Sequence, residues 1–262
     1  MTDQFDAATL FEPVAGLFQR NFPPEELAER RRRIFAQIGD GVALLQGAGA
    51  AGGVSLFRQT NDFYYLCGIE VPHSYLLLDG ATGRSTVYLP HRDAIEVHEG
   101  PRLAAEDAET AVAMTGVDTV ASTESMSLDL QRLVLKRGAF HCYTPFGPAE
   151  QGDTRDQLLR ARALAAAEGW AQQQNREGHF VELLRSRFPT LHVRDLSPVL
   201  DQLRLIKSTR EADLCRRAGR LAGLATAEAM RSSGPGVTEY ELAALAGFCF
   251  GLGGAGGRDI ER

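Results

Sequence analysis

Long apolar runs, paired cysteines and an excess of positive charge are all missing from this sequence of 262 residues. No stretch approaches the roughly 18 consecutive apolar residues of a membrane-spanning helix. The first ten residues carry Asp3 and Asp6, whereas a secretory signal peptide needs positive charge followed by an apolar segment. The sequence therefore predicts a protein with no membrane partner and no secretion signal.

The four cysteines are scattered, and none of them forms a C-x-x-C pair. This spacing argues against a secreted disulfide framework and against a zinc cluster. We therefore expect a cytoplasmic protein in a reducing compartment. The four positions are Cys67, Cys142, Cys215 and Cys249.

The sequence has one block of basic residues, Arg30-Arg31-Arg32-Arg33, and its formal net charge is -6. Proteins that bind nucleic acid usually carry a basic face, so the overall charge argues against that partner. Glu25, Glu26 and Glu29 precede the arginines within one helix-like segment. The block is therefore predicted to be a solvated helix face.

Strands alternating with helices are predicted from residue 25 to residue 193, which indicates an α/β layer with both faces of the sheet covered. Helices are expected over residues 25–38, 124–137 and 153–188, the last with an interruption at Glu177-Gly178. Strands are expected over residues 42–46, 74–78, 84–89, 139–143 and 191–193. Residues 79–83 join two of these strands as a hairpin loop.

The pattern changes near residue 197 to helices with clear start signals, which predicts two domains, residues 1–196 and 197–262. Ser208 and Glu211 have capping-box spacing, and Thr238 and Glu241 repeat it. Residues 234–236 separate the two helices. The glycine-rich chain from Gly251 onward is not expected to continue a helix.

Two segments could form a cofactor or metal site, but a purely structural role fits each of them better. Residues 47–52 match G-x-G-x-x-G after a strand, yet the residues that follow do not read as the helix that a dinucleotide site requires, so a loop is favoured. His91, His98 and nearby carboxylates could supply metal ligands, but they lack a spacing that brings them together. The aromatic run over residues 63–65 is read as core packing at the start of a strand.

Five motifs in a fixed order resemble the Xaa-Pro aminopeptidase, prolidase and creatinase family. The most recognisable is Gln59 with residues 61–66 and Gly68, followed by an E-x-x-x-G-x-R-L element from Glu96 to Leu103. The other three are residues 31–33 with 41–45, residues 198–211 and residues 235–239. The resemblance covers about residues 25–245.

The resemblance implies a creatinase/prolidase-type amino-terminal domain, a mixed sheet flanked by helices, followed by the first helices of an incomplete pita-bread α+β domain. It also implies an aminopeptidase that acts on peptides with proline second, using two Mn²⁺ or similar ions held by two Asp, one His and two Glu. Those ligands would follow residue 239, where the sequence offers no His and, after Glu241, only Asp259 and Glu261 as carboxylates. We therefore expect a truncated chain that holds no catalytic metal and is inactive alone.

Three residues are the candidates for a substrate access path, namely Arg58, Gln59 and His98. Several aminopeptidases of the family have Trp at the position of His98, reaching towards a neighbouring subunit's active site, so this departure weakens the substrate-closing role. The resemblance also predicts a homo-oligomer. The alternatives are a non-catalytic peptide-binding or oligomerisation module of the same fold, and a creatinase-like or prolidase-like hydrolase.

Overall fold

The computed structural model describes residues 21–50, 57–95, 102–167 and 175–254. These residues separate into two compact units. The described residues from 21 to 206 form one unit, and the described residues from 207 to 254 belong to the other. In the described ranges no helix is long and apolar enough to cross a membrane.

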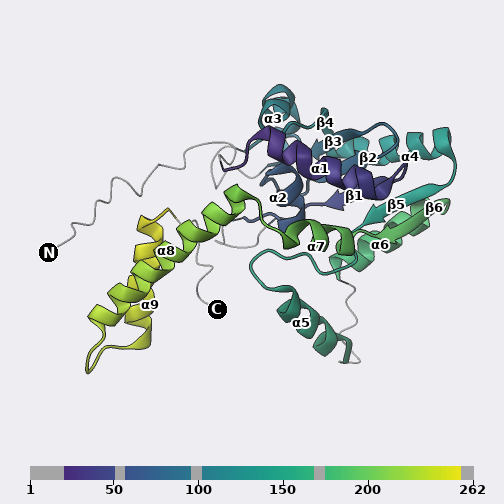
Figure 1. Ribbon diagram of the computed structural model, residues 1–262. Helices are drawn as coiled ribbons and strands as arrows, with labels where there is room; N and C mark the ends of the chain where they lie inside the picture. The colour runs from purple at the N-terminus through teal and green to yellow at the C-terminus, as the bar shows by residue number, and fades with distance from the viewer. Residues whose placement is uncertain (1–20, 51–56, 96–101, 168–174, 255–262) are drawn as a thin grey trace. The chain divides into compact units, whose positions relative to one another are not determined.

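The first unit is a six-stranded mixed sheet in the order β4-β3-β2-β1-β5-β6 (Figure 1). β1 pairs with β2 antiparallel and with β5 parallel, β2–β3 is antiparallel, and β3–β4 and β5–β6 are parallel. This arrangement confirms the predicted α/β fold with a mixed sheet. The strands are β1 (Val42–Gln46), β2 (Tyr75–Asp79), β3 (Arg84–Leu89), β4 (Thr119–Ser122), β5 (Phe140–Thr144) and β6 (Leu191–Asp195).

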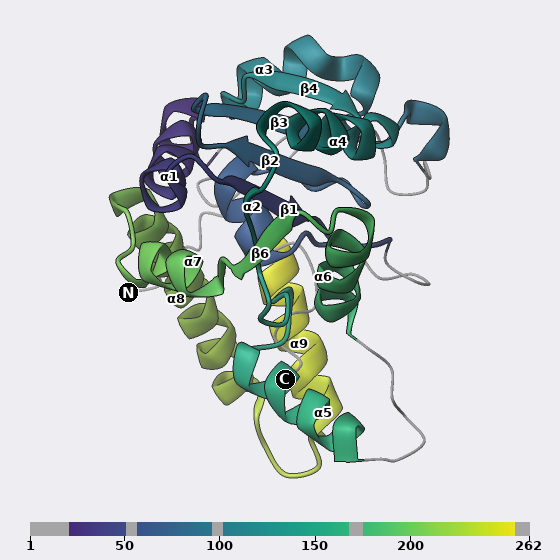
Figure 2. The ribbon, with the colours of Figure 1, turned by 90° about the vertical axis from the view of Figure 1, so that its right-hand side faces the viewer.

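Seven helices of this unit are α1 (Pro24–Ile38), α2 (Asn61–Cys67), α3 (Ala108–Thr115), α4 (Met126–Arg137), α5 (Arg155–Ala167), α6 (Arg176–Arg187) and α7 (Ser197–Leu205). Figure 2 shows α1 and α7 on one side of the sheet and α4 and α6 on the other. β1 explains this layering, because its successive side chains point to opposite faces. Ala43 and Leu45 pack into a core with α1, α2, α3 and α7, whereas Val42 and Leu44 pack into a second core with α4 and α6.

Two expectations about elements are wrong, and two elements were not expected. The aromatic run Phe63-Tyr64-Tyr65 lies in α2 and not at the start of a strand, although Phe63 and Tyr65 are buried as expected. Glu177 and Gly178 begin α6 and do not interrupt a helix, because Asn175 caps that helix by accepting a hydrogen bond from the Gly178 amide. α3 and β4 had no counterpart in the sequence analysis.

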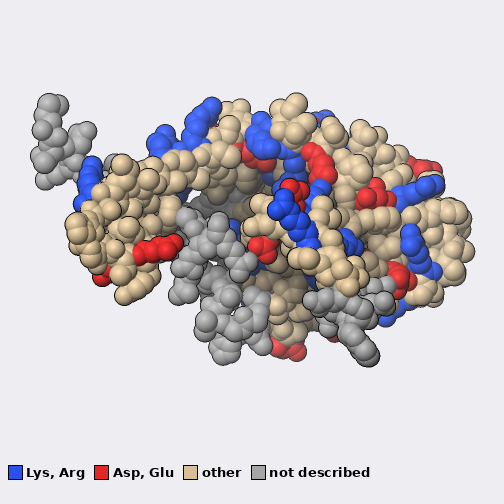
Figure 3. All heavy atoms as spheres, turned by 90° about the horizontal axis from the view of Figure 1, so that it is seen from below, with Lys and Arg blue, Asp and Glu red and all other residues tan. Residues whose placement is uncertain are grey.

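The arginine block is not a solvated face throughout. Arg30 and Arg31 are buried, with 4% and 2% of their surface exposed, while Arg32 and Arg33 are exposed and pair with Glu29. Arg31 donates hydrogen bonds to the carbonyls of Leu66, Thr115 and Gly116, at the ends of α2 and α3. On the face shown in Figure 3, side chains of both signs are interspersed.

The second unit contains α8 (Thr209–Ser232) and α9 (Glu239–Leu252), which pack against each other. The Ser208–Glu211 capping box forms as predicted: the Ser208 hydroxyl accepts from the Glu211 amide, and the Glu211 carboxylate accepts from the Ser208 amide. Glu241 accepts from the Thr238 amide in the same way. α9 continues through Gly251 to Leu252, two residues beyond the expected stop.

The domain boundary between residues 196 and 197 stays a prediction. α7 follows that position and packs against α1, and its Leu200 is fully buried in the core beneath α1 and α2. The two compact units divide later, between Ile206 and Lys207.

Candidate functional site

β1 and β5 are parallel neighbours from which the chain leaves in opposite directions. After Gln46 the chain leads to α2 on one face of the sheet, and after Thr144 it leads to α5 and then to α6 on the other face. In open α/β sheets, ligands bind in the crevice that such a divergence leaves at the carboxyl ends of the strands. The topology thus marks one place in this unit for a site.

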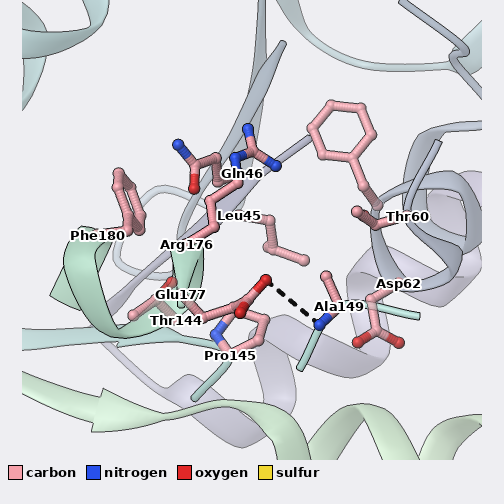
Figure 4. A pocket seen from close by; sticks show the side chains of 11 residues that line it. Leu45, Gln46, Thr60, Asp62, Thr144, Pro145, Ala149, Arg176, Glu177 and Phe180 are labelled. Atoms are coloured by element: carbon pink, nitrogen blue, oxygen red, sulfur yellow. Dashed lines mark hydrogen bonds between the residues drawn. The ribbon is translucent and has the colours of Figure 1, made fainter. Parts of the chain in front are cut away.

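A small cavity of about 30 Å³ lies at this place (Figure 4). A cavity needs roughly 10–15 Å³ of this kind to hold one water molecule, so the space suits two waters or one small polar group. Its inner wall is buried and its rim is half-buried. The inner wall consists of Leu45, Thr60, Phe63, Thr144 and Phe180, and the polar rim consists of Gln46, Asp62, Arg176 and Glu177.

The loop after β5 is attached to both sides of the cavity. The Asn61 amide donates to the Glu150 carbonyl at 2.7 Å, so the loop is fixed to the start of α2. On the other side, the Ala149 amide donates to Glu177 Oε1 at 3.3 Å, a contact drawn in Figure 4. The second oxygen of Glu177 accepts from Asn175 Nδ2 at 2.8 Å. The carboxylate of Glu177 therefore holds the loop to α6.

Asp62, on the rim of the cavity, forms an ion pair with Arg204. Arg204 Nη1 lies 2.7 Å from Asp62 Oδ1 and 3.3 Å from Glu150 Oε2, which joins α2, α7 and the loop. Burial raises the pKa of the Asp62 carboxyl above its ordinary value, and Arg204 opposes this shift. Asp62 is therefore a paired carboxylate at the edge of the cavity.

Arg176 differs from these charged neighbours because it forms no ion pair with any described carboxylate. It is the first residue of α6, and Figure 4 shows its side chain extending from that helix toward Gln46. Burial lowers the pKa of its guanidinium, which remains charged at neutral pH. Arg176 thus brings to the cavity a positive charge that no described carboxylate contacts as an ion pair, although the neighbouring Glu177 favours its charged form.

The three predicted access residues lie in different surroundings. Gln59 is buried and crosslinks two segments: its Oε1 accepts from the amides of Ala48 and Thr60, and its Nε2 donates to the Val71 carbonyl. The carbonyl of Arg58, an exposed residue, accepts from Gln151. His98 lies outside the described residues. Their role in substrate access stays a prediction.

Sequence reasoning missed Arg176, Thr60 and Thr144. Thr144-Pro145 at the end of a strand was a usable signal, and so was Asn175 as a helix cap. The role of Arg176 depends on where α6 crosses the sheet, which the sequence does not specify.

The G-x-G-x-x-G segment and the His91 segment make contacts typical of a structural loop and a surface segment, not of a cofactor or metal site. In residues 47–50 no helix begins, and the amides of Gly47 and Ala48 bond to the Ser74 carbonyl and to Gln59. His91 lies 2.6 Å from Glu106 on the surface, and Arg92 pairs with Asp107. Across the described ranges, no three His, Cys, Asp or Glu side chains gather as a metal site. The described residues therefore do not provide the ligands of a dinuclear metal centre.

A family profile described as aminopeptidase P, N-terminal domain, matches residues 27–143. The Xaa-Pro aminopeptidase of Haemophilus influenzae is 28% identical over 86% of this chain and 47% of its own length. That of Escherichia coli strain K12 is 26% identical over 83% of this chain and 47% of its own length. The chain thus spans about half the length of these relatives.

The fold comparison agrees. The E. coli aminopeptidase P bound to the inhibitor Pro-Leu superimposes with a TM-score of 0.66 at 25% identity, covering 89% of this chain and 50% of that one. Another structure of that protein is Zn-substituted and in complex with product. The profile, the relatives and the fold agree on one family: residues 27–143 match the amino-terminal domain of aminopeptidase P, and the described fold is similar to that of aminopeptidase P.

Proposed function

We propose that this chain supplies the amino-terminal domain of an Xaa-Pro aminopeptidase, a hydrolase that releases the first residue of peptides with proline second. The observation that carries the proposal is the family match over residues 27–143, which spans nearly all of α1 and every strand from β1 through most of β5. The prolidase and creatinase alternatives gain no such support, because the matched relatives are Xaa-Pro aminopeptidases.

Within this proposal the two manganese-type ions of the family are not held by the described residues. The expected ligand set of two Asp, one His and two Glu would follow residue 239, and the printed sequence has no His after His192. The role of this chain is then to fold, to assemble and to border the substrate path. Bond hydrolysis requires ligands from elsewhere.

A chimera tests the proposal. The full chain would be fused to the part of the E. coli Xaa-Pro aminopeptidase that follows its aligned half, and the product would be assayed on an Xaa-Pro peptide with Mn²⁺. We expect metal-dependent release of the first residue. The matched control is the same E. coli segment without this chain, which should be much less active because it lacks its amino-terminal domain.

A chimera that folds and binds metal but is no more active than that control would contradict the proposal. Metal content and thermal unfolding would be measured on both proteins, so that a misfolded fusion is recognised and rebuilt with a shifted junction.

A further inference from the structure

We propose that the cavity at the carboxyl ends of β1 and β5 binds a small monocarboxylate, held by the guanidinium of Arg176 and the hydroxyls of Thr60 and Thr144. The proposal concerns a binding site in the first unit and does not depend on peptide hydrolysis.

The first support is that two hydroxyls line the cavity without a hydrogen-bond partner among the described residues. Thr60 and Thr144 line it with 4% and 1% of their surface exposed. Thr60 stands at the start of α2, yet its side chain does not cap that helix. Among the described residues the Thr144 hydroxyl has no hydrogen-bond partner either. Neither hydroxyl is fully enclosed by protein atoms, so both can bond to a ligand or to ordered water in the cavity.

The second support is the charge of Arg176 at the rim of the same cavity. Its planar guanidinium matches the geometry of a carboxylate, which it can bind through two parallel hydrogen bonds. It has no ion-pair partner among the described carboxylates, whereas Arg155 and Arg204 are both paired. A cation that forms no ion pair, beside two hydroxyl donors, is complementary to one negative charge.

The size and the walls of the cavity narrow the ligand to a small monocarboxylate. The space of about 30 Å³ admits a carboxylate group and little more. Leu45, Phe63 and Phe180 provide an apolar wall for the carbon stem of an acid. Asp62 and Glu177 at the rim would repel a doubly charged phosphate more strongly than a singly charged ligand.

A metal cation is disfavoured by the same contacts. Asp62 is paired with Arg204, both oxygens of Glu177 accept hydrogen bonds, and Arg176 would repel a cation. The carboxylate could belong to a free short-chain acid or to an acidic side chain of another protein, since both present the same group.

Titration of the full chain with sodium acetate tests the proposal, with sodium chloride at equal ionic strength as the reference and amide NMR shifts as the readout. We expect saturable shifts in residues 144–149 and 175–178 with a dissociation constant in the millimolar range. Sodium phosphate should bind more weakly. An N-acetylated peptide containing Asp, compared with its Asn analogue, distinguishes a protein side chain from a free acid.

Arg176→Gln should weaken acetate binding by about tenfold or more, because it removes the charged donor. Thr60→Val keeps the shape and removes one hydroxyl, and should weaken binding by a smaller factor. The matched control is Arg187→Gln, an exposed arginine at the other end of α6, which should leave binding unchanged.

Unchanged acetate affinity in Arg176→Gln would overturn the proposal, as would equal shifts with acetate and chloride, which would leave water as the occupant. Phosphate binding tighter than acetate would overturn the choice of ligand. Arg176 is half-buried at a helix start, so the variant should fold. If its melting temperature falls, Arg176→Lys keeps the charge and should bind acetate more tightly than the Gln variant.

Discussion

Arg31 is the residue whose placement explains most about the first unit. It contributes three hydrogen bonds to the last carbonyls of α2 and α3, where the partial negative charge of each helix end also favours a cation. Burial lowers its pKa, but the side chain stays charged. Its neighbour Arg30 lies between the rings of Phe22 and Tyr65 and donates to the Tyr65 carbonyl.

The sequence contained the signal for this burial. Leu27, Arg31, Ile34 and Ile38 recur at the spacing of one helix face, so Arg31 occupies an apolar stripe. We predicted a solvated face because the block is charged, and this prediction was wrong for Arg30 and Arg31.

Replacing Arg31 with Met should destabilise the first unit by about 3 kcal/mol, because each buried carbonyl left without a donor costs roughly 1–3 kcal/mol. Urea unfolding would measure this change. Arg32→Met is the control: Arg32 lies one position further along the same helix and is 75% exposed, so its loss should have little effect. Equal stabilities of the two variants would show that the Arg31 contacts contribute nothing.

His91 should titrate above its ordinary range, because its hydrogen bond with Glu106 raises the pKa of the imidazole. The contribution of this contact to stability is present below about pH 6.5, the unfolded value, and is lost as pH rises through the folded pKa. Glu106→Gln should return the pKa of His91 toward 6.5 in an NMR titration. The exposed Glu109→Gln should not, and a shift of equal size there would refute the assignment.

At the scale of elements, the sequence specified helices and strands well where one pattern dominated, as in α1, β1, β3 and the capped start of α8. It failed at α2, where Phe63-Tyr64-Tyr65 favours a strand locally. There the helix is selected by packing, because Phe63, Leu66 and Cys67 are buried on one face and Gly68 ends it in a left-handed conformation.

The cavity was not predictable from local patterns. It depends on β1 and β5 being parallel neighbours and on α2 and α6 covering opposite faces, both of which are properties of the assembled sheet. Gln59 was found through its motif, but its contacts show a crosslink between the residues after β1 and those before β2.

The capping box at Ser208 allows a prediction for α8. Ser208→Ala removes the acceptor of the Glu211 amide and should destabilise the first turn by about 1 kcal/mol. Hydrogen exchange at residues 209–212 should be faster, while exchange in the middle of the helix changes less. Ser233→Ala, at the other end of α8, is the control. No acceleration at 209–212 would show that the cap contributes nothing.

At the scale of the whole molecule, we propose self-association through the second unit. Its helices expose large apolar side chains, among them Met230, Tyr240 and Phe248, the last two at 74% and 63%. Burial of apolar surface contributes about 25 cal/mol per Å², so a few hundred Å² would supply several kcal/mol. We expect light scattering coupled to gel filtration to give a mass above the 28.5 kDa of one chain.

A Tyr240→Glu, Phe248→Glu variant should lower the measured mass toward that of one chain. The control Arg231→Glu, at a position that is already charged, should leave the mass unchanged. A monodisperse 28.5 kDa particle for the unaltered chain at tens of micromolar would contradict the proposed association.

Our central proposal is that this chain supplies the amino-terminal domain of an Xaa-Pro aminopeptidase and does not itself hold the catalytic metal ions. The most direct measurement is mass-spectrometric detection of the first residue released from an Xaa-Pro peptide by the purified chain, with Mn²⁺, Zn²⁺ or Co²⁺ added in turn. The account predicts no release with any of these metals. Metal-dependent release that persists through repeated purification and is abolished by a chelator would contradict it.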